Sequence, residues 1–199
     1  MEDKAKAEAM DDLFARAVEK AGEVCRPGVG LVWGDGPLDA PIAFVGEAPG
    51  QQETRMRCPF VGQAGKVFDR ELGEAGIDRS KCWVTNAVKC RTVRVSPSGG
   101  VVNRCPNNTE LSDWLPLLIE ELEIVRPAVI VCLGGVAAKA VIGKGFGTMT
   151  GQRGMWTDGP SGSRVIATFH PSYVNRSPAA RQAFREDLNE AKRVSEGRI

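Results

Sequence analysis

The chain has 199 residues, of which 42% are hydrophobic and 26% are charged, and its formal net charge is +1. This composition is typical of one compact domain and excludes a disordered, collagen-like or disulfide-stapled chain. No apolar run reaches the ~18–20 residues of a membrane span, and the charged segment 1–8 lacks the apolar region of a signal peptide. We therefore expect a cytoplasmic monomer with no membrane contact and no obligate protein partner. The six cysteines are irregularly spaced, which favours reduced thiols or metal ligands over disulfides.

Hydrophobic periodicity predicts alternating helices and strands along the chain. Apolar side chains recur at helical spacing over residues 2–24, and Arg26-Pro27-Gly28 ends that helix. Residues 91–108 are rich in Arg, Ser, Pro, Gly and Asn without periodicity, so they are predicted to form a loop. Short apolar runs predict buried strands at 42–45, 83–85, 128–133 and 165–169. Further helices are predicted at 63–76, 110–125, 135–141 and 178–194.

Strands that alternate with helices predict an α/β fold with parallel strands. We expect one domain over residues 1–199, an α/β/α sandwich around a central, mostly parallel, four-stranded sheet, with the helix within 1–25 packed on it. Three strands end in polar or Gly-rich loops, at 46–50, at Asn86 and at His170-Pro171-Ser172. Because ligands bind beyond the carboxyl ends of parallel strands, these loops should converge on one cleft.

Four side chains in or near these loops have chemistry suited to a flat, polar ligand. Glycines around Glu47 let backbone N–H groups approach a ligand, and Glu47 adds a carboxylate. The amide of Asn86 can read a base edge, and Phe60 can stack on a ring. His170 is the only histidine of the chain. Each also has an ordinary structural explanation, respectively a tight turn, a helix cap, a core aromatic and a structural histidine.

Basic residues concentrate in the middle of the chain, although the total charge is near zero. A near-neutral total can conceal a basic face that binds nucleic acid, and scattered solvated charges are the alternative. The basic residues of this region are Arg55, Arg57, Lys89, Arg91, Arg94 and Arg104.

Five stretches together resemble the uracil-DNA glycosylase superfamily and, within it, its bacterial and archaeal family 4. They lie within residues 25–194 and read FVGEAPGQQE at 44–53, PFVGQAG at 59–65, TNAVKCR at 85–91, NRCP at 103–106 and HPSY at 170–173. The resemblance implies a monofunctional glycosylase of DNA base excision repair. Such an enzyme hydrolyses the N-glycosidic bond of a flipped-out uracil and leaves an abasic site.

The resemblance assigns roles by position. Phe60 would stack on the extruded pyrimidine, and Asn86 would select uracil through its edge. Glu47 and the backbone of Ala48 would line the sugar and the attacking water, and His170 would donate a hydrogen bond to O2 of the leaving base. The most efficient members of the superfamily carry Asp at the position of Ala48, and family 4 lacks it. Gly46, Pro49 and Gly50 are the other substrate-binding positions, and the loop from Ser172 through Tyr173 to Arg176 would enter the minor groove. The basic residues that flank the predicted cleft loops are further predicted DNA-binding positions, namely Arg55, Lys89, Arg91 and Arg104.

Family 4 also implies a [4Fe–4S] cluster held by four cysteines. Cys25 and Cys90 match two ligand positions, whereas Gly22 and the helix position near Trp114 are not cysteine. Cys105 is a candidate substitute for a third ligand. With two positions unmatched, we expect no cofactor. The remaining cysteines are Cys58 and Cys82, which are candidates for a fourth ligand, and Cys132, which reads as a core thiol.

Three other interpretations stay open from the sequence. The same chemistry can act on a bulkier modified pyrimidine, because segments 92–102 and 143–162 are idiosyncratic. A non-catalytic relative would bind damaged DNA without cutting it, which the joint presence of Glu47, Phe60, Asn86 and His170 disfavours. A redox or iron–sulfur module is the third, and a colourless protein would exclude it.

Overall fold

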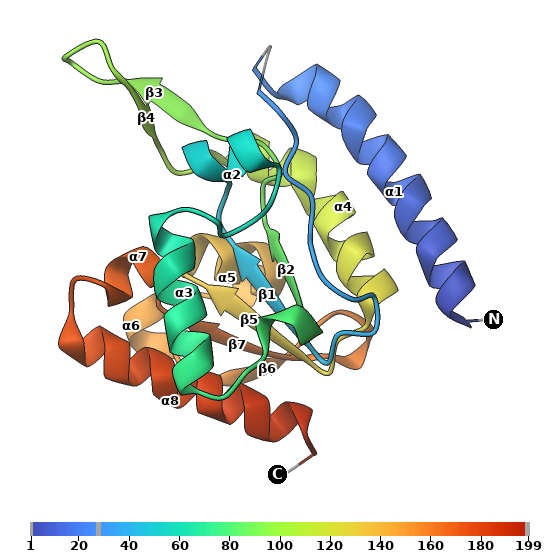
Figure 1. Cartoon of the computed structure of the whole chain (residues 1–199), viewed down its shortest axis with the longest axis vertical. Helices are drawn as coiled ribbons and strands as arrows, with labels where there is room; N and C mark the ends of the chain where they lie inside the picture. Colours follow the sequence, from blue (N-terminus) through green and yellow to red (C-terminus); the bar gives the residue numbers. More distant parts are fainter. Residues whose placement is uncertain (1, 27–28, 198–199) are drawn as a thin grey trace.

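The computed structural model describes residues 2–26 and 29–197, and its centre is a twisted five-stranded sheet (Figure 1). The strand order is β2-β1-β5-β7-β6, with β6 antiparallel to β7 and the other neighbours parallel. The mostly parallel α/β sheet is therefore confirmed, but it has five strands where four were predicted. The strands of this sheet are β1 (Ile42–Gly46), β2 (Cys82–Asn86), β5 (Val129–Leu133), β6 (Trp156–Asp158) and β7 (Arg164–Thr168).

Helices cover both faces of the sheet, as the alternation of strand side chains requires. Ile42 and Phe44 pack toward a core formed with α3, α7 and α8, whereas Ala43 and Val45 pack toward a second core formed with α1, α4 and α5. In Figure 1, α1 lies along the outer side of α4. The helices are α1 (Glu2–Val24), α2 (Gln51–Met56), α3 (Gln63–Glu74), α4 (Asn108–Val125), α5 (Gly135–Ile142), α6 (Met149–Gln152), α7 (Pro171–Val174) and α8 (Pro178–Ser195).

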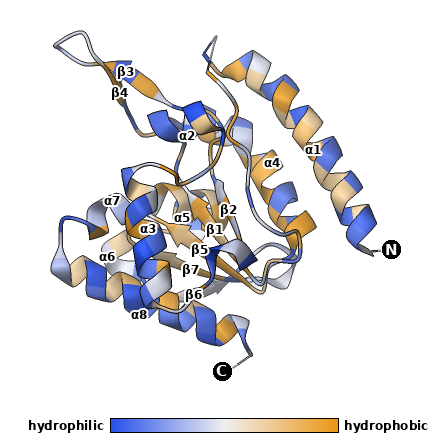
Figure 2. Cartoon of the chain, in the orientation of Figure 1, coloured by the Kyte–Doolittle hydropathy of each residue, from blue (hydrophilic) through white to orange (hydrophobic). Residues whose placement is uncertain are grey.

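Most predicted elements are confirmed to within a few residues, including the N-terminal helix and the final helix. No helix in the described part of the chain is long and apolar enough to cross a bilayer. Hydrophobic residues concentrate on the central strands and on the inner sides of the helices (Figure 2). The long helices thus follow the amphipathic pattern from which they were predicted.

The prediction of a plain loop at 91–108 is wrong. This segment contains a separate antiparallel hairpin of β3 (Val93–Val95) and β4 (Val101–Asn103), which projects from the body of the molecule beside α2 (Figure 1). Strands of three residues are too short for a period-2 pattern to reveal them, and the same applies to β6. Both were missed for that reason.

The path of the chain through the sheet marks where a ligand should bind. From β1 the chain moves outward to β2, and it later returns to β5 on the other side of β1. Such a reversal of strand order opens a crevice at the carboxyl ends of the strands. The loops after β1, β2 and β7 surround this end of the sheet.

Candidate active site

A cleft of about 590 Å³ opens at the carboxyl ends of the parallel strands. Glu47 follows β1, Asn86 ends β2 and His170 follows β7, and all three line the cleft. The prediction that these three loops converge is therefore confirmed. The other predicted site residues that line it are Ala48, Pro49, Gly50, Phe60, Arg104 and Ser172.

Phe60 forms an aromatic wall of the cleft, with its ring centroid 6.1 Å from that of His170. A methyl group on Gly46 would lie 2.4 Å from Asn86 Oδ1 and 2.6 Å from the Phe60 ring, and one on Gly65 would lie 1.9 Å from the Phe60 carbonyl oxygen. Only residues without a side chain fit at these two positions. Gly46 therefore makes room for the two side chains that face the cleft, and its own contact with substrate stays a prediction.

Glu53 holds the loop that carries Phe60, although the sequence suggested no role for it. Its carboxylate is nearly buried and accepts a 2.6 Å hydrogen bond from the backbone N–H of Gly62. This bond joins α2 to segment 59–62. The only signal in the sequence was an acidic residue in the first turn of the helix that begins just after Pro49-Gly50.

Asn86 is almost fully buried at the end of β2. The loops after β1 and β2 are joined because the N–H groups of Ala87 and Val88 donate to the carbonyl oxygens of Gly46 and Glu47, at 2.9 and 3.0 Å. The position of the Asn86 amide relative to the Glu47 carboxylate is thus set by main-chain hydrogen bonds.

The prediction that Lys89 contacts DNA is wrong, because its side chain is completely buried. Its ammonium pairs with the Glu121 carboxylate of α4 and donates to Thr85 Oγ1 at 2.6 Å and to the Asn86 carbonyl oxygen at 2.9 Å. Burial lowers the pKa of Lys89, and the Glu121 carboxylate opposes that shift. Lys89 therefore supports the strand end that carries Asn86 from beneath. Trp83 Nε1 donates to the second carboxylate oxygen of Glu121 at 3.0 Å.

His170 caps the short helix α7 and presents its ring to the cleft. Its Nδ1 accepts a hydrogen bond from the Ser172 N–H at 3.2 Å and lies 2.8 Å from Ser172 Oγ. Burial lowers the pKa of His170 to about 4, so the imidazole is neutral near pH 7. Because Nδ1 accepts from the backbone, the ring proton belongs on Nε2. No hydrogen-bond partner for Nε2 occurs among the described residues, which leaves this N–H available to a ligand.

Glu47 is a half-buried carboxylate with a thiol beside it. Burial raises the pKa of Glu47, and a hydrogen bond from the Cys105 thiol opposes that shift. The same carboxylate raises the pKa of Cys105. Cys105 lines the cleft, and its raised pKa keeps the thiol neutral near pH 7.

Two of the predicted DNA-binding residues, Arg104 and Ser172, line the cleft, whereas Arg55 and Arg91 line a separate surface depression. Arg104 lines the cleft, but its guanidinium makes two hydrogen bonds to Glu110, at 2.7 and 2.6 Å. Arg91 donates to Asn103 Oδ1 at 2.7 Å. The exposed predicted DNA-binding residues are Arg55 on α2 and Ser172, Tyr173 and Arg176 on or just after α7.

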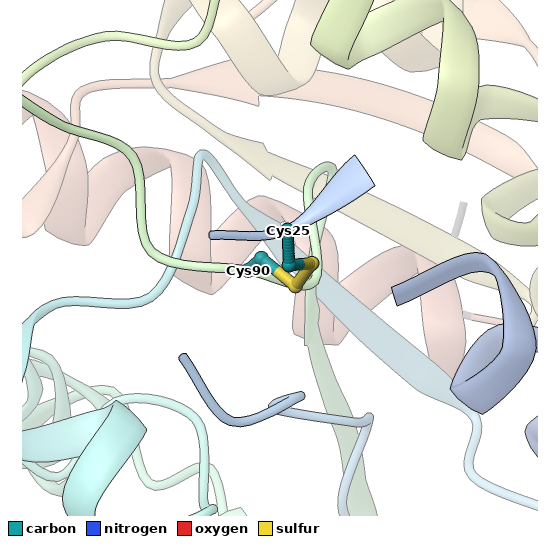
Figure 3. Close-up of a disulfide and its surroundings, with 2 residues drawn as sticks. All are labelled: Cys25 and Cys90. Atoms are coloured by element: carbon teal, nitrogen blue, oxygen red, sulfur yellow. A yellow bond between two sulfur atoms is a disulfide. The ribbon is translucent and has the colours of Figure 1, made fainter. Parts of the chain in front are cut away.

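The cysteines do not assemble as the iron–sulfur ligands of the resemblance. Cys25 and Cys90 form a disulfide with their Cα atoms 6.0 Å apart, where free thiols or ligands were predicted (Figure 3). The two cysteines line a cavity of about 40 Å³, and the fully buried ring of Trp114 lines it as well. Cys105 belongs to the main cleft instead, and residues 2–26 and 29–197 contain no group of three or more His, Cys, Asp or Glu that suits a metal ion. The described residues therefore do not fit a [4Fe–4S] cluster, which needs four thiolates around one space.

Comparison with known proteins agrees with the geometry. The family described as the uracil DNA glycosylase superfamily matches residues 33–192. A Type-4 uracil-DNA glycosylase of Thermotoga maritima is 39% identical over 164 residues, which cover 81% of each chain. A Type-4 uracil-DNA glycosylase of Pyrobaculum aerophilum is 35% identical over 78% of each chain. One of Archaeoglobus fulgidus is 32% identical over 91% of this chain and 90% of the relative.

Proposed function

The chain belongs to the uracil DNA glycosylase superfamily, whose enzymes hydrolyse N-glycosidic bonds in DNA, and on that basis we propose that it excises uracil. We propose a monofunctional reaction in which the uracil nucleotide is flipped out of the DNA and an abasic site remains. The observation that carries the proposal is the convergence of Glu47, Phe60, Asn86 and His170 on one cleft. All four side chains come from the described residues of one chain, and we propose a monomeric enzyme.

Base recognition would rest on Phe60 and Asn86. A flipped pyrimidine can stack on the Phe60 ring, which compensates part of the few kcal/mol needed to unstack it. The amide oxygen of Asn86 would accept from N3–H of uracil, and its NH₂ would donate to O4. Cytosine presents the opposite pattern at these two atoms, so the same amide disfavours it.

Departure of the base would rest on His170. Cleavage of the C1′–N1 bond moves an electron pair onto the pyrimidine, and negative charge develops on O2. The neutral imidazole of His170, with its proton on Nε2, can donate to that oxygen. A preorganised donor of this kind contributes about 3–4 kcal/mol to other enzymes because it acts mainly in the transition state.

Attack by water would rest on Glu47. The sugar becomes an oxocarbenium-like cation as the base leaves, and a carboxylate near it stabilises that charge. Ala48 supplies no acidic side chain, so Glu47 is the carboxylate of this loop that can orient the water and accept its proton. The neutral Cys105 thiol beside Glu47 would favour the ionised carboxylate, which is the form that accepts a proton from water.

The DNA on either side of the flipped nucleotide would contact the exposed residues of α7 and α2. Ser172 lines the cleft, and Tyr173 and Arg176 follow it as exposed residues; this segment would enter the minor groove and fill the space left by the base. Arg55 would face a phosphate from the opposite side.

The test is single-turnover cleavage of oligonucleotides that each contain one lesion, followed by alkaline scission of abasic sites. Uracil should be released, His170→Ala should lose about 10²–10³-fold in rate, and Asn86→Asp should lose uracil excision. The matched control is Asn189→Asp, at an exposed position on α8. Release of substituted pyrimidines in place of uracil would favour the modified-base alternative. Tight binding without any cleavage would favour the non-catalytic one.

A further inference from the structure

The β3–β4 hairpin, residues 93–103, is a structural feature that the glycosylase proposal leaves without a role. Within the described part of the chain, its two strands pair only with each other, with Val95 opposite Val101 and Val93 opposite Asn103. Its tip, residues 96–100, is closed by a 2.7 Å hydrogen bond from the Ser96 N–H to the Gly100 carbonyl oxygen. Two-stranded ribbons of this size are marginal on their own, so a partner surface would stabilise it.

One face of the hairpin continues the wall of the cleft. Residues opposite each other in an antiparallel pair share a face, so Val95, Val101 and Asn103 lie on the same side. Asn103 lines the cleft, whereas Val95 and Val101 lie further out and are 63% and 57% exposed. Figure 2 shows hydrophobic residues on this projecting hairpin. An apolar strip therefore leads from the cleft toward the hairpin tip.

The charge of this region points to a polyanion. Residues 79–109 contain six Lys or Arg and no Asp or Glu, and four of the six pair with carboxylates outside this segment, namely Arg79, Lys81, Lys89 and Arg104. In the described part of the chain, neither Arg91 nor Arg94 forms an ion pair with a carboxylate. Arg91 also lines a shallow surface depression together with Arg55 and Arg57 of the α2 region. Positive charge thus runs from α2 to the base of the hairpin.

We propose that the β3–β4 hairpin binds the substrate DNA outside the base pocket, along the strand that flanks the flipped nucleotide. The Val95–Val101 pair packs against deoxyribose or an exposed base edge. Arg94 lies on the opposite face of the ribbon with Val102, and its long side chain reaches a backbone phosphate around the edge of the ribbon. This inference rests on the proposed glycosylase function. DNA is favoured over a protein partner because the apolar strip shares its face with Asn103 of the substrate cleft. In addition, the two side chains here that form no ion pair with a described carboxylate, Arg91 and Arg94, are both basic.

The experiment compares Arg94→Gln/Val95→Ser/Val101→Ser with a matched control, Arg164→Gln/Val18→Ser, whose residues are exposed on β7 and α1. Affinity is measured by fluorescence anisotropy on long duplexes with and without a non-cleavable abasic-site analogue. Excision rates are measured on long and on very short uracil oligonucleotides. Melting temperatures of the same preparations verify folding, and Arg94→Gln alone provides a variant that leaves the apolar strip intact.

The hairpin variant should bind long DNA on the order of three- to tenfold more weakly than the control, and Arg94→Gln should lower the slope of log K against log salt by about 0.9. On an oligonucleotide too short to reach the hairpin, the triple hairpin variant and Arg94→Gln should both excise uracil at the wild-type rate. Equal affinity of hairpin and control variants for long DNA would overturn the proposal. The proposal would also be overturned if the hairpin variant lost excision rate equally on short and long substrates. A hairpin variant with a changed oligomeric state but unchanged DNA binding would overturn it too.

Failure of the glycosylase proposal would be distinguishable from failure of this one. If the wild-type protein released no base from any oligonucleotide, the anisotropy comparison on undamaged duplex would still test the hairpin.

Discussion

The buried ion pair beneath Asn86 gives a quantitative prediction. Lys89→Met removes the ammonium and leaves the Glu121 carboxylate at 0% side-chain exposure, with hydrogen bonds from Trp83 Nε1 and Thr85 Oγ1 only. An uncompensated buried charge typically costs about 3–5 kcal/mol of unfolding free energy. For a chain of this size each kcal/mol lowers the melting temperature by about 2–4 °C, so the expected decrease is about 6–20 °C.

The assay is thermal and urea unfolding of the wild type, Lys89→Met, Glu121→Leu and the double variant. Replacement of both partners by apolar residues removes both charges, so the double variant should be less destabilised than the sum of the single variants by about 2–3 kcal/mol. Lys4→Met is the matched control, because Lys4 is 84% exposed and its loss should hardly change the melting temperature.

The same variant reports on the active site. Lys89 Nζ holds the Asn86 carbonyl oxygen at 2.9 Å, so Lys89→Met should also lower the single-turnover rate per folded molecule. A Lys89→Met protein that melted within about 2 °C of the wild type would refute the assignment of a desolvated, paired ammonium at this position.

Three further predictions concern protonation and metal content. His170 has a pKa of about 4 in the folded state and near 6.5 when unfolded, so protons bind the unfolded state preferentially as the pH falls through this window. Protonation of His170 should therefore lower the free energy of unfolding of the wild type by about 2 kcal/mol between about pH 7 and pH 5. In urea titrations, His170→Asn should lack this part of the pH dependence. Cys105→Ala should raise the pKa of Glu47 further and move the acid limb of the pH–rate profile to higher pH, whereas Cys105→Ser, which keeps a donor, should not; coincident profiles would contradict the contact. The purified protein should contain no stoichiometric iron and show no broad visible absorbance, and about four irons per chain would place Cys25 and Cys90 in a cluster.

The order of the major elements and the location of the cleft could be read from the sequence. The long helices have apolar stripes of sufficient length, and the central strands are short apolar runs that stop at Gly, Asn or His. These signals are local, and burial on both faces of a parallel sheet produces them directly. Glu47, Asn86 and His170 could be assigned to one cleft because parallel strands align their carboxyl ends.

Only the tertiary structure decided which polar residues are buried and which face solvent. Lys89 occurs four residues after Thr85 in a basic stretch, and nothing local distinguishes it from a surface lysine. Its burial depends on Glu121, which is 32 residues away and reaches it across the packing of α4 against the sheet. The pairing of Cys25 with Cys90 and the separation of Cys105 from both are likewise set by contacts distant in sequence. Hydrophobic periodicity records which face of an element is apolar, whereas the partner of a buried charge or thiol is determined by how separate elements pack.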